Sequence, residues 1–118
     1  MKLTIDKGEA KGITILTCHG RIIFGEDSNA LRDAVRQALT PTARTVVVNL
    51  SDVTYLDSGA LGMLVGLCSA TRSEGAHVKL AALSQRLRDM LQTTRLASVF
   101  EVYETEEQAL ASLEAGKP

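Results

Sequence analysis

The fold is decided by the stretch Val53-Thr54-Tyr55-Leu56-Asp57-Ser58-Gly59-Ala60-Leu61-Gly62-Met63-Leu64. It places the hydroxyl of Ser58 between an apolar strand and a helix that begins without charged side chains. Residues 45–50, just before it, are β-branched and apolar on both faces, which is typical of a buried central strand. From Ser58 to Thr71 no side chain is charged. One apolar stripe recurs there at helical spacing and predicts a helix over residues 58–73, namely Leu61, Leu64, Val65 and Cys68.

The glycines of this helix need a physical reason. Gly59, Gly62 and Gly66 each cost about 0.8 to 1 kcal/mol of helix propensity relative to alanine. Close approach by another surface is one such reason. Gly62, Gly66 and Met63 lie off the predicted core stripe, so we expect them to face a partner. The alternative is that these glycines admit close packing inside the domain.

Strand and helix patterns alternate along the rest of the chain. Two strands joined by a hairpin loop over residues 8–12 should pair antiparallel, and the later alternation implies right-handed crossovers and parallel strands. We therefore predict one α/β domain over residues 1–118, with a mixed four- or five-stranded sheet, about four helices and a frayed tail at 115–118. The expected strands are 3–7, 13–18, 45–50, 77–81 and 99–102, and the expected helices are 27–40, 58–73, 84–93 and 105–115, with Gly75 ending the second helix and Thr105 capping the last.

Composition excludes several classes of function. The 118 residues are 45% hydrophobic but only 3% aromatic, and the net charge is −1, so neither a basic surface nor base-stacking rings favour nucleic acid. The N-terminus becomes charged too early for a secretory signal, and the longest uncharged run is too short to span a bilayer. We expect a cytosolic protein with no direct membrane insertion. Cys18 and Cys68 should be free, buried thiols, and His19 and His77 look isolated rather than metal-binding.

The chain resembles the STAS domains, and among them the bacterial anti-sigma factor antagonists, over nearly its whole length. The resemblance rests on motifs in order, namely Gly20-Arg21-Ile22, Ala30-Leu31-Arg32, Val46-Val47-Val48-Asn49-Leu50-Ser51, Leu56-Asp57-Ser58-Gly59-Ala60-Leu61-Gly62 and Leu96-Ala97-Ser98-Val99-Phe100. The order and spacing of the motifs are more specific than any one of them. The family often has an acidic residue soon after the early glycine, whereas here the acids follow only at Glu26 and Asp27.

The resemblance implies a switch built on Ser58. Unphosphorylated protein would bind an anti-sigma factor that is also a serine kinase and would free a sigma factor. The kinase, with ATP and Mg²⁺ in its own site, would phosphorylate Ser58 and end the interaction, and a phosphatase would reset it. The protein itself would be no enzyme and would need no cofactor or metal. From the residues alone, the simplest role of Asp57-Ser58 is helix capping by either side chain, and a capping hydroxyl can still be a kinase substrate.

Residues 21–27 should form a loop beside this serine. Ile23 and Phe24 are two bulky apolar side chains in an otherwise polar or glycine-containing segment. Either they fold inward over the end of the core, or they form an exposed apolar knob that enlarges the docking surface. The expected partner-binding residues are thus Asp57, Ser58, Gly59, Gly62, Met63, Gly66, Ile23 and Phe24.

Other functional classes fit less well. A hydrolase would need Ser58 to act with His19 or His77, but the Gly-x-Ser-x-Gly elbow is missing from the sequence. A receiver domain would need acids at strand ends where Lys7 and Asn49-Leu50 stand, and the sequence has no phosphate-binding loop. The remaining alternative is a constitutive STAS subunit of a stress-signalling assembly or of a lipid-transport ATPase complex.

Overall fold

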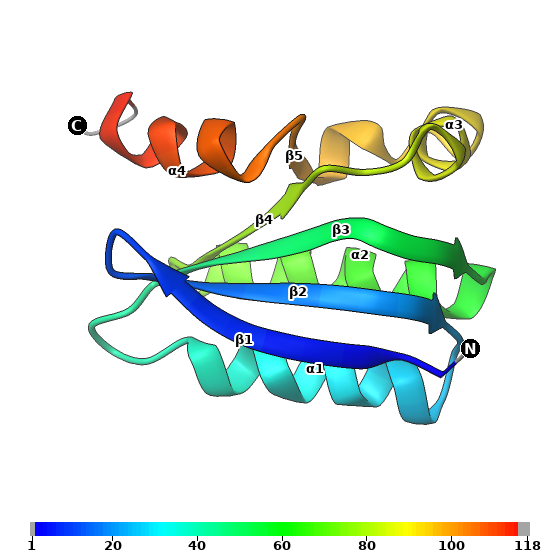
Figure 1. Cartoon of the computed structure of the whole chain (residues 1–118), viewed down its shortest axis with the longest axis horizontal. Helices are drawn as coiled ribbons and strands as arrows, with labels where there is room; N and C mark the ends of the chain where they lie inside the picture. Colours follow the sequence, from blue (N-terminus) through cyan, green and yellow to red (C-terminus); the bar gives the residue numbers. More distant parts are fainter. Residues whose placement is uncertain (1, 116–118) are drawn as a thin grey trace.

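A computed structural model describes residues 2–115, without the side chains of Ala97, Glu114 and Ala115. Its five strands form one sheet in the order β1-β2-β3-β4-β5; the first pair is antiparallel and the others are parallel. The predicted mixed α/β sheet with four helices is confirmed (Figure 1). The elements are β1 (Thr4–Ala10), β2 (Ile13–Ile22), α1 (Glu26–Ala38), β3 (Thr45–Leu56), α2 (Ser58–Ser73), β4 (His77–Ala81), α3 (Gln85–Thr93), the 3₁₀ turn η1 (Ala97–Val99), β5 (Glu101–Tyr103) and α4 (Glu106–Ala115).

The sheet separates two apolar cores. Alternate residues of β3 point to opposite faces, so Val46 and Val48 join the large core while Val47 joins the small one. The large core packs the sheet against α1, α2 and α3, through residues such as Leu31, Leu64 and Leu87. Against the other face lies α4, which contributes Ala109 and Leu110. Figure 1 shows α1 and α2 behind the sheet and α4 on the other side.

The hairpin between β1 and β2 is tighter than predicted. Lys11 and Gly12 alone form the turn, with φ angles of 54° and 79°, and Ala10 pairs with Ile13. Two positive φ angles match the right-handed twist of the strands, as in type I′ turns. The prediction of a loop over residues 8–12 is therefore wrong for 8–10, because cross-strand pairing extends an exposed edge strand through residues with little β propensity.

The strands that lead to α2 and α1 are longer than predicted. β2 continues to Ile22 instead of residue 18, and β3 continues to Leu56 instead of residue 50. The extension of β3 buries Val53 and Leu56 and leaves their neighbours exposed. Bulges in the pairing of β2 with β3 let both strands end together, with Ile22 beside Leu56. This register brings the start of α1 and the start of α2 to the same edge of the sheet.

Several predicted helix ends are confirmed in detail. Ser84 caps α3 by accepting the Leu87 N–H at 3.3 Å, and the Thr105 hydroxyl accepts the Gln108 N–H at 3.0 Å. Gly75, with φ of 82°, ends α2, where the N–H of Ala76 bonds the carbonyl of Thr71 at 2.8 Å. That pattern is a Schellman motif.

Other boundaries were predicted wrongly. α1 begins at Glu26 behind Gly25 and ends at Ala38 rather than residue 40. Residues 97–99 form η1, so β5 covers only 101–103. Apart from Ala115 in α4, the tail predicted at 115–118 lies outside the described residues. Within residues 2–115, the helices are all too short or too polar to cross a bilayer.

Candidate functional site at the start of α2

Asp57, not Ser58, caps α2. The Asp57 side chain accepts the backbone N–H of Ala60 at 2.8 Å, and the Asp57 carbonyl accepts that of Leu61 at 2.9 Å. Ser58 is the first residue of the helix and is exposed. Its hydroxyl has no hydrogen-bond partner among the residues that the structure describes. Of the two candidate caps, Asp57 is therefore the one that caps the helix, and Ser58 stays exposed to solvent.

The same carboxylate holds the loop that precedes α1. Both oxygens of Asp57 lie 3.1 Å from the backbone nitrogen of Phe24, and the Asp57 N–H bonds the carbonyl of Ile22 at 3.3 Å. The loop comprises only residues 23–25, because Arg21 belongs to β2 and Glu26 and Asp27 to α1. The prediction of a loop over 21–27 is therefore corrected, but its place beside Ser58 is confirmed.

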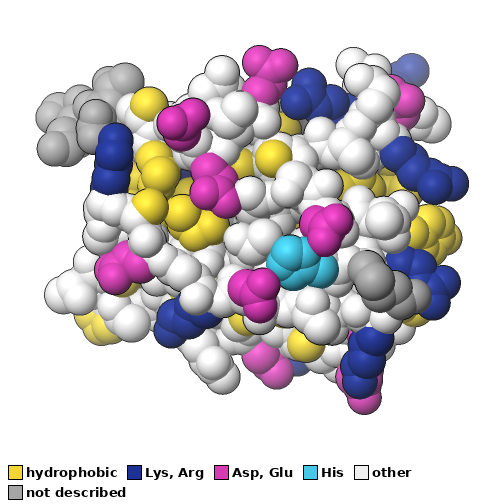
Figure 2. Space-filling view, in the orientation of Figure 1, with side chains coloured by type: hydrophobic (Ala, Val, Ile, Leu, Met, Phe, Trp, Pro, Cys, Tyr) yellow, Lys and Arg dark blue, Asp and Glu magenta, His cyan; other side chains and the backbone are white. Residues whose placement is uncertain are grey.

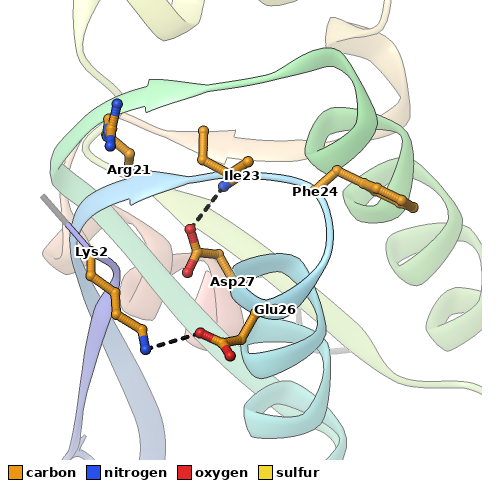
Figure 3. Close-up of a pocket in the computed structure, with 6 residues that line it drawn as sticks. All are labelled: Lys2, Arg21, Ile23, Phe24, Glu26 and Asp27. Carbon is orange, nitrogen blue, oxygen red and sulfur yellow. Dashed lines mark hydrogen bonds and ion pairs between the residues drawn. The ribbon is translucent and has the colours of Figure 1, made fainter.

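Further hydrogen bonds fix this loop from the side of α1. Asp27 accepts the Ile23 N–H at 3.2 Å, and the buried Ser28 hydroxyl accepts the Gly25 N–H at 2.9 Å. Gly25 has a φ of 117°, a conformation that favours glycine. A shallow pocket of about 380 Å³ lies on this side of the loop (Figure 3), and its lining residues are Lys2, Arg21, Ile23, Phe24, Glu26 and Asp27.

Phe24 is exposed, whereas Ile23 is half-buried. The Phe24 side chain keeps 66% of its surface accessible, so inward packing is wrong for Phe24. Figure 3 shows its ring pointing away from Asp27 and toward α2. An ideal Cβ placed on Gly59 would lie 2.6 Å from Phe24 Cβ and 2.7 Å from Phe24 Cγ. Gly59 is therefore the glycine that permits a close approach, and the approaching group comes from the chain itself.

The two later glycines lie in open space. Gly62 and Gly66 are exposed, and a Cβ on either would meet no atom within 4 Å. Close packing inside the domain therefore does not account for them. Met63 is half-buried against the large core, so it is less separate from the core stripe than predicted. At Gly62 and Gly66 the exposed surface of α2 is thus uncharged and has open space above it.

Both cysteines are buried, and both histidines are hydrogen-bonded to carboxylates. Cys18 and Cys68 are free and buried, and burial raises the pKa of their thiols to about 12 and about 11. The expectation that the histidines are isolated is wrong. The ring of His19 lies 2.6 Å from Asp52 and 3.0 Å from Asp6, and that of His77 lies 2.8 Å from Glu101. The part of the chain that is described has no cluster of three or more His, Cys, Asp or Glu suited to a metal ion.

A second polar cluster lies on the sheet face that α4 covers. The ammonium group of Lys79 donates to Glu101 at 2.7 Å and to the Tyr103 hydroxyl at 3.3 Å. Burial would raise the pKa of Glu101, but the bonds to Lys79 and His77 outweigh it and hold that pKa below its ordinary value. Figure 2 shows acidic and basic side chains interspersed over this side of the molecule. This side therefore has no large area of a single charge.

Two features of the site were not predicted. The hydrogen bond from Phe24 to Asp57 and the contact of Phe24 with Gly59 join residues 33 and 35 positions apart in the sequence. Nothing in either segment marks the pairing. The helix cost of Gly59 indicated a close approach without naming the neighbour, and the family resemblance placed residues 21–27 beside Ser58 without naming the contact.

Comparison with known proteins now gives the family. The family model described as the STAS domain matches residues 4–109 of this chain. This chain belongs to the STAS-domain family. It is 40% identical over 84 residues to a STAS-domain-containing protein of Pseudomonas aeruginosa (strain UCBPP-PA14), covering 70% of this chain and 80% of that one. It is also 31% identical over 83 residues to the anti-sigma-B factor antagonist of Bacillus subtilis (strain 168), covering 68% and 76%.

This STAS domain also shares its fold with solved structures. The anti-sigma factor antagonist SpoIIAA in its unphosphorylated form superposes with a TM-score of 0.73, at 16% identity, over 98% of this chain and 99% of that one. The phosphorylated form of SpoIIAA, from Bacillus, has a TM-score of 0.68 at 16% identity, over 93% and 99%. At this identity the likeness concerns the fold alone.

Proposed function

We propose that this STAS domain is an anti-sigma factor antagonist whose binding is switched off by phosphorylation of Ser58. The observation that carries the proposal is the exposed serine at the first position of α2, whose hydroxyl has no partner among the described residues and lies beside an uncharged helix surface. The relative named anti-sigma-B factor antagonist supports the role, and the existence of a phosphorylated form of SpoIIAA supports the type of switch.

The unphosphorylated protein binds an anti-sigma factor that is also a serine kinase, and so releases a sigma factor. The kinase transfers the γ-phosphoryl group of ATP to Ser58 Oγ, with loss of the hydroxyl proton and departure of ADP. ATP and Mg²⁺ are held by the kinase, a phosphatase removes the phosphoryl group, and this domain contributes binding without catalysis. The docking surface that we propose comprises Asp57, Ser58, Gly59, Gly62, Met63, Gly66, Ile23 and Phe24.

The size of the electrostatic effect suits a binary switch. A phosphoryl group adds a charge of about −1.5 to −2, and the N-terminus of a helix favours an anion, so the modified domain stays folded. A partner carboxylate about 4 Å away would be repelled by about 4 kcal/mol at an effective dielectric near 20. Because about 2.7 kcal/mol already corresponds to a hundredfold change in affinity, part of this repulsion is enough to end binding.

The test uses the anti-sigma factors of the histidine-kinase-like ATPase class from the same organism, each purified and incubated with this protein and ATP. We expect mass spectrometry to find one phosphoryl group on Ser58. Ser58→Ala should bind and resist release by ATP, while Ser58→Asp should stay folded and bind at least tenfold more weakly. Ser69→Ala is the matched control, because Ser69 is also an exposed serine of α2.

Equal affinities of Ser58→Ala and Ser58→Asp for every such kinase would overturn the switch. A stable complex that forms regardless of the state of Ser58 would instead indicate the constitutive subunit of a stress-signalling assembly or a lipid-transport ATPase complex.

A further inference from the structure

We infer that phosphorylation of Ser58 also releases Phe24 from α2, because the phosphoryl group would stand beside the Asp57 carboxylate that holds the Phe24 N–H. This inference rests on the proposed modification of Ser58 and adds a change of shape to the change of charge. The loop at residues 23–25 is tied to the start of α2 by two features only among those described. These are the bonds from the Phe24 N–H to both Asp57 oxygens and the contact of the Phe24 side chain with Gly59.

The Asp57 carboxylate is shared between two elements. One of its oxygens also accepts the Ala60 N–H at 2.8 Å, so the same group caps α2 and holds the loop. A phosphoryl group on Ser58 would stand on the next residue and carry like charge. The nearby N–H groups of Ser58 and Gly59 have no acceptor in the described part of the chain, and they attract the phosphoryl group toward Asp57 and the ring over Gly59.

The weaker of the two Asp57 attachments should break first. The bonds to Phe24 measure 3.1 Å, against 2.8 Å for the bond to Ala60. Because Ile23 and Gly25, on either side of Phe24, are bonded to Asp27 and Ser28 of α1, the release is confined to the Phe24 peptide group and ring and leaves α1 folded. Since Phe24 is already 66% exposed, its release exposes little further surface and costs mainly the contact with Gly59.

Fluorine NMR tests this directly. The chain has only two phenylalanines, so labelling with 4-fluorophenylalanine gives one signal from Phe24 and one from Phe100, which is 7% exposed and serves as an internal reference. Phosphoserine is installed at position 58 during translation, which removes any dependence on a kinase. Gly59→Ala supplies the signal of a displaced Phe24, because the added Cβ would lie 2.6 Å from Phe24 Cβ.

We expect phosphoserine at position 58 to move the Phe24 signal by at least half of the shift seen in Gly59→Ala, and to leave the Phe100 signal in place. Phosphoserine at position 69, an exposed position of α2, should move neither signal. In Asp57→Asn, which keeps an acceptor without the charge, phosphoserine at position 58 should have less than half of its effect. An unchanged Phe24 signal, or an effect that persists undiminished in Asp57→Asn, overturns the inference.

The same proteins separate this inference from the proposed function. Loss of kinase binding with an unmoved Phe24 signal would leave the switch standing and remove the loop release. A shifted Phe24 signal with unchanged binding to every candidate kinase would support the loop release and overturn the proposed switch.

Discussion

Asp57 and Glu101 are two carboxylates that each join separate elements of the fold, but they leave their neighbours in different states. Glu101 on β5 is paired with Lys79 and His77 of β4, and Lys79 also reaches the Tyr103 hydroxyl. Asp57 instead accepts backbone N–H groups from the loop and from α2, and leaves the Ser58 hydroxyl without a partner in the described structure. Charged side chains that satisfy one another stabilise the fold, whereas a polar group that the fold leaves unpaired is available to a partner.

The largest effect on this comparison should come from Asp57→Ala. The change removes a helix cap, worth about 1 kcal/mol, and a hydrogen bond to a charged acceptor, worth about 1.5 to 3 kcal/mol. We expect the free energy of unfolding to fall by about 2 to 4 kcal/mol in urea denaturation. Ser58→Ala is the control and should stay within about 0.5 kcal/mol of the wild type. A larger loss in Ser58→Ala than in Asp57→Ala would mean that the serine, not the aspartate, is the cap.

Glu101→Gln should have the next largest effect. The Lys79 side chain is only 7% exposed, so its ammonium group would lose a charged acceptor away from water. We expect a loss of about 1 to 3 kcal/mol near neutral pH. Glu104→Gln removes an exposed pair with Arg88 at 3.8 Å and should cost about 0 to 1 kcal/mol. Similar costs for both would show that burial of Lys79 contributes nothing.

The stability difference between Glu101→Gln and the wild type should also depend on pH. Because the pKa of Glu101 is lowered in the folded protein, its contribution is complete above its ordinary value of 4.5 and is lost as the pH falls through the lower, folded pKa. The stability of the wild type should therefore approach that of Glu101→Gln as the pH is lowered below 4.5. A gap between the two that stays constant from pH 7 into this range would contradict the ionic role of Glu101.

Phe24→Ala should separate binding from stability. Its ring is exposed, so we expect the free energy of unfolding to change by less than about 1 kcal/mol, far from the loss of about 3 to 5 kcal/mol typical of a buried phenylalanine. Under the proposed function, binding to the kinase should weaken by about 2 kcal/mol or more, as for an aromatic hot spot. Calorimetric titration and urea denaturation measure the two effects. A large loss of stability would instead indicate that the Phe24 side chain packs in the core.

The smallest effect should come from one substitution at two positions of α2. Gly62→Ala adds a methyl group in open space and should stabilise the protein by about 0.5 to 1 kcal/mol through helix propensity. Gly59→Ala has the same intrinsic gain, but its methyl group would collide with Phe24, so the gain should be cancelled or reversed. Thermal unfolding compares them. Gly62→Gln then tests docking, because it should obstruct the partner without lowering the melting temperature, since glutamine also favours a helix more than glycine does.

Local patterns in the amino-acid sequence were sufficient for much of the fold. The stripe of Leu61, Leu64 and Cys68 marks a helix with one buried side, and the run at 45–50 marks a buried strand. Gly75 and Ser84 end and begin helices through hydrogen bonds within a few residues, so their roles are visible in short segments. The same short range explains why Ser58 could be placed at a helix start.

What needed the tertiary structure was the detailed contacts and register that join distant segments. The ends of β2 and β3 depend on their mutual register, so their lengths were underestimated when each strand was considered alone. Between Asp57 and Ser58, the choice of cap depended on which side chain also meets the Phe24 N–H, 33 residues away in the sequence. The exposure of Phe24 also depends on contacts between segments that are distant in the sequence. Hydrophobicity predicts that an apolar side chain gains by burial, but the short, doubly anchored loop turns this ring toward Gly59 and leaves it accessible to solvent.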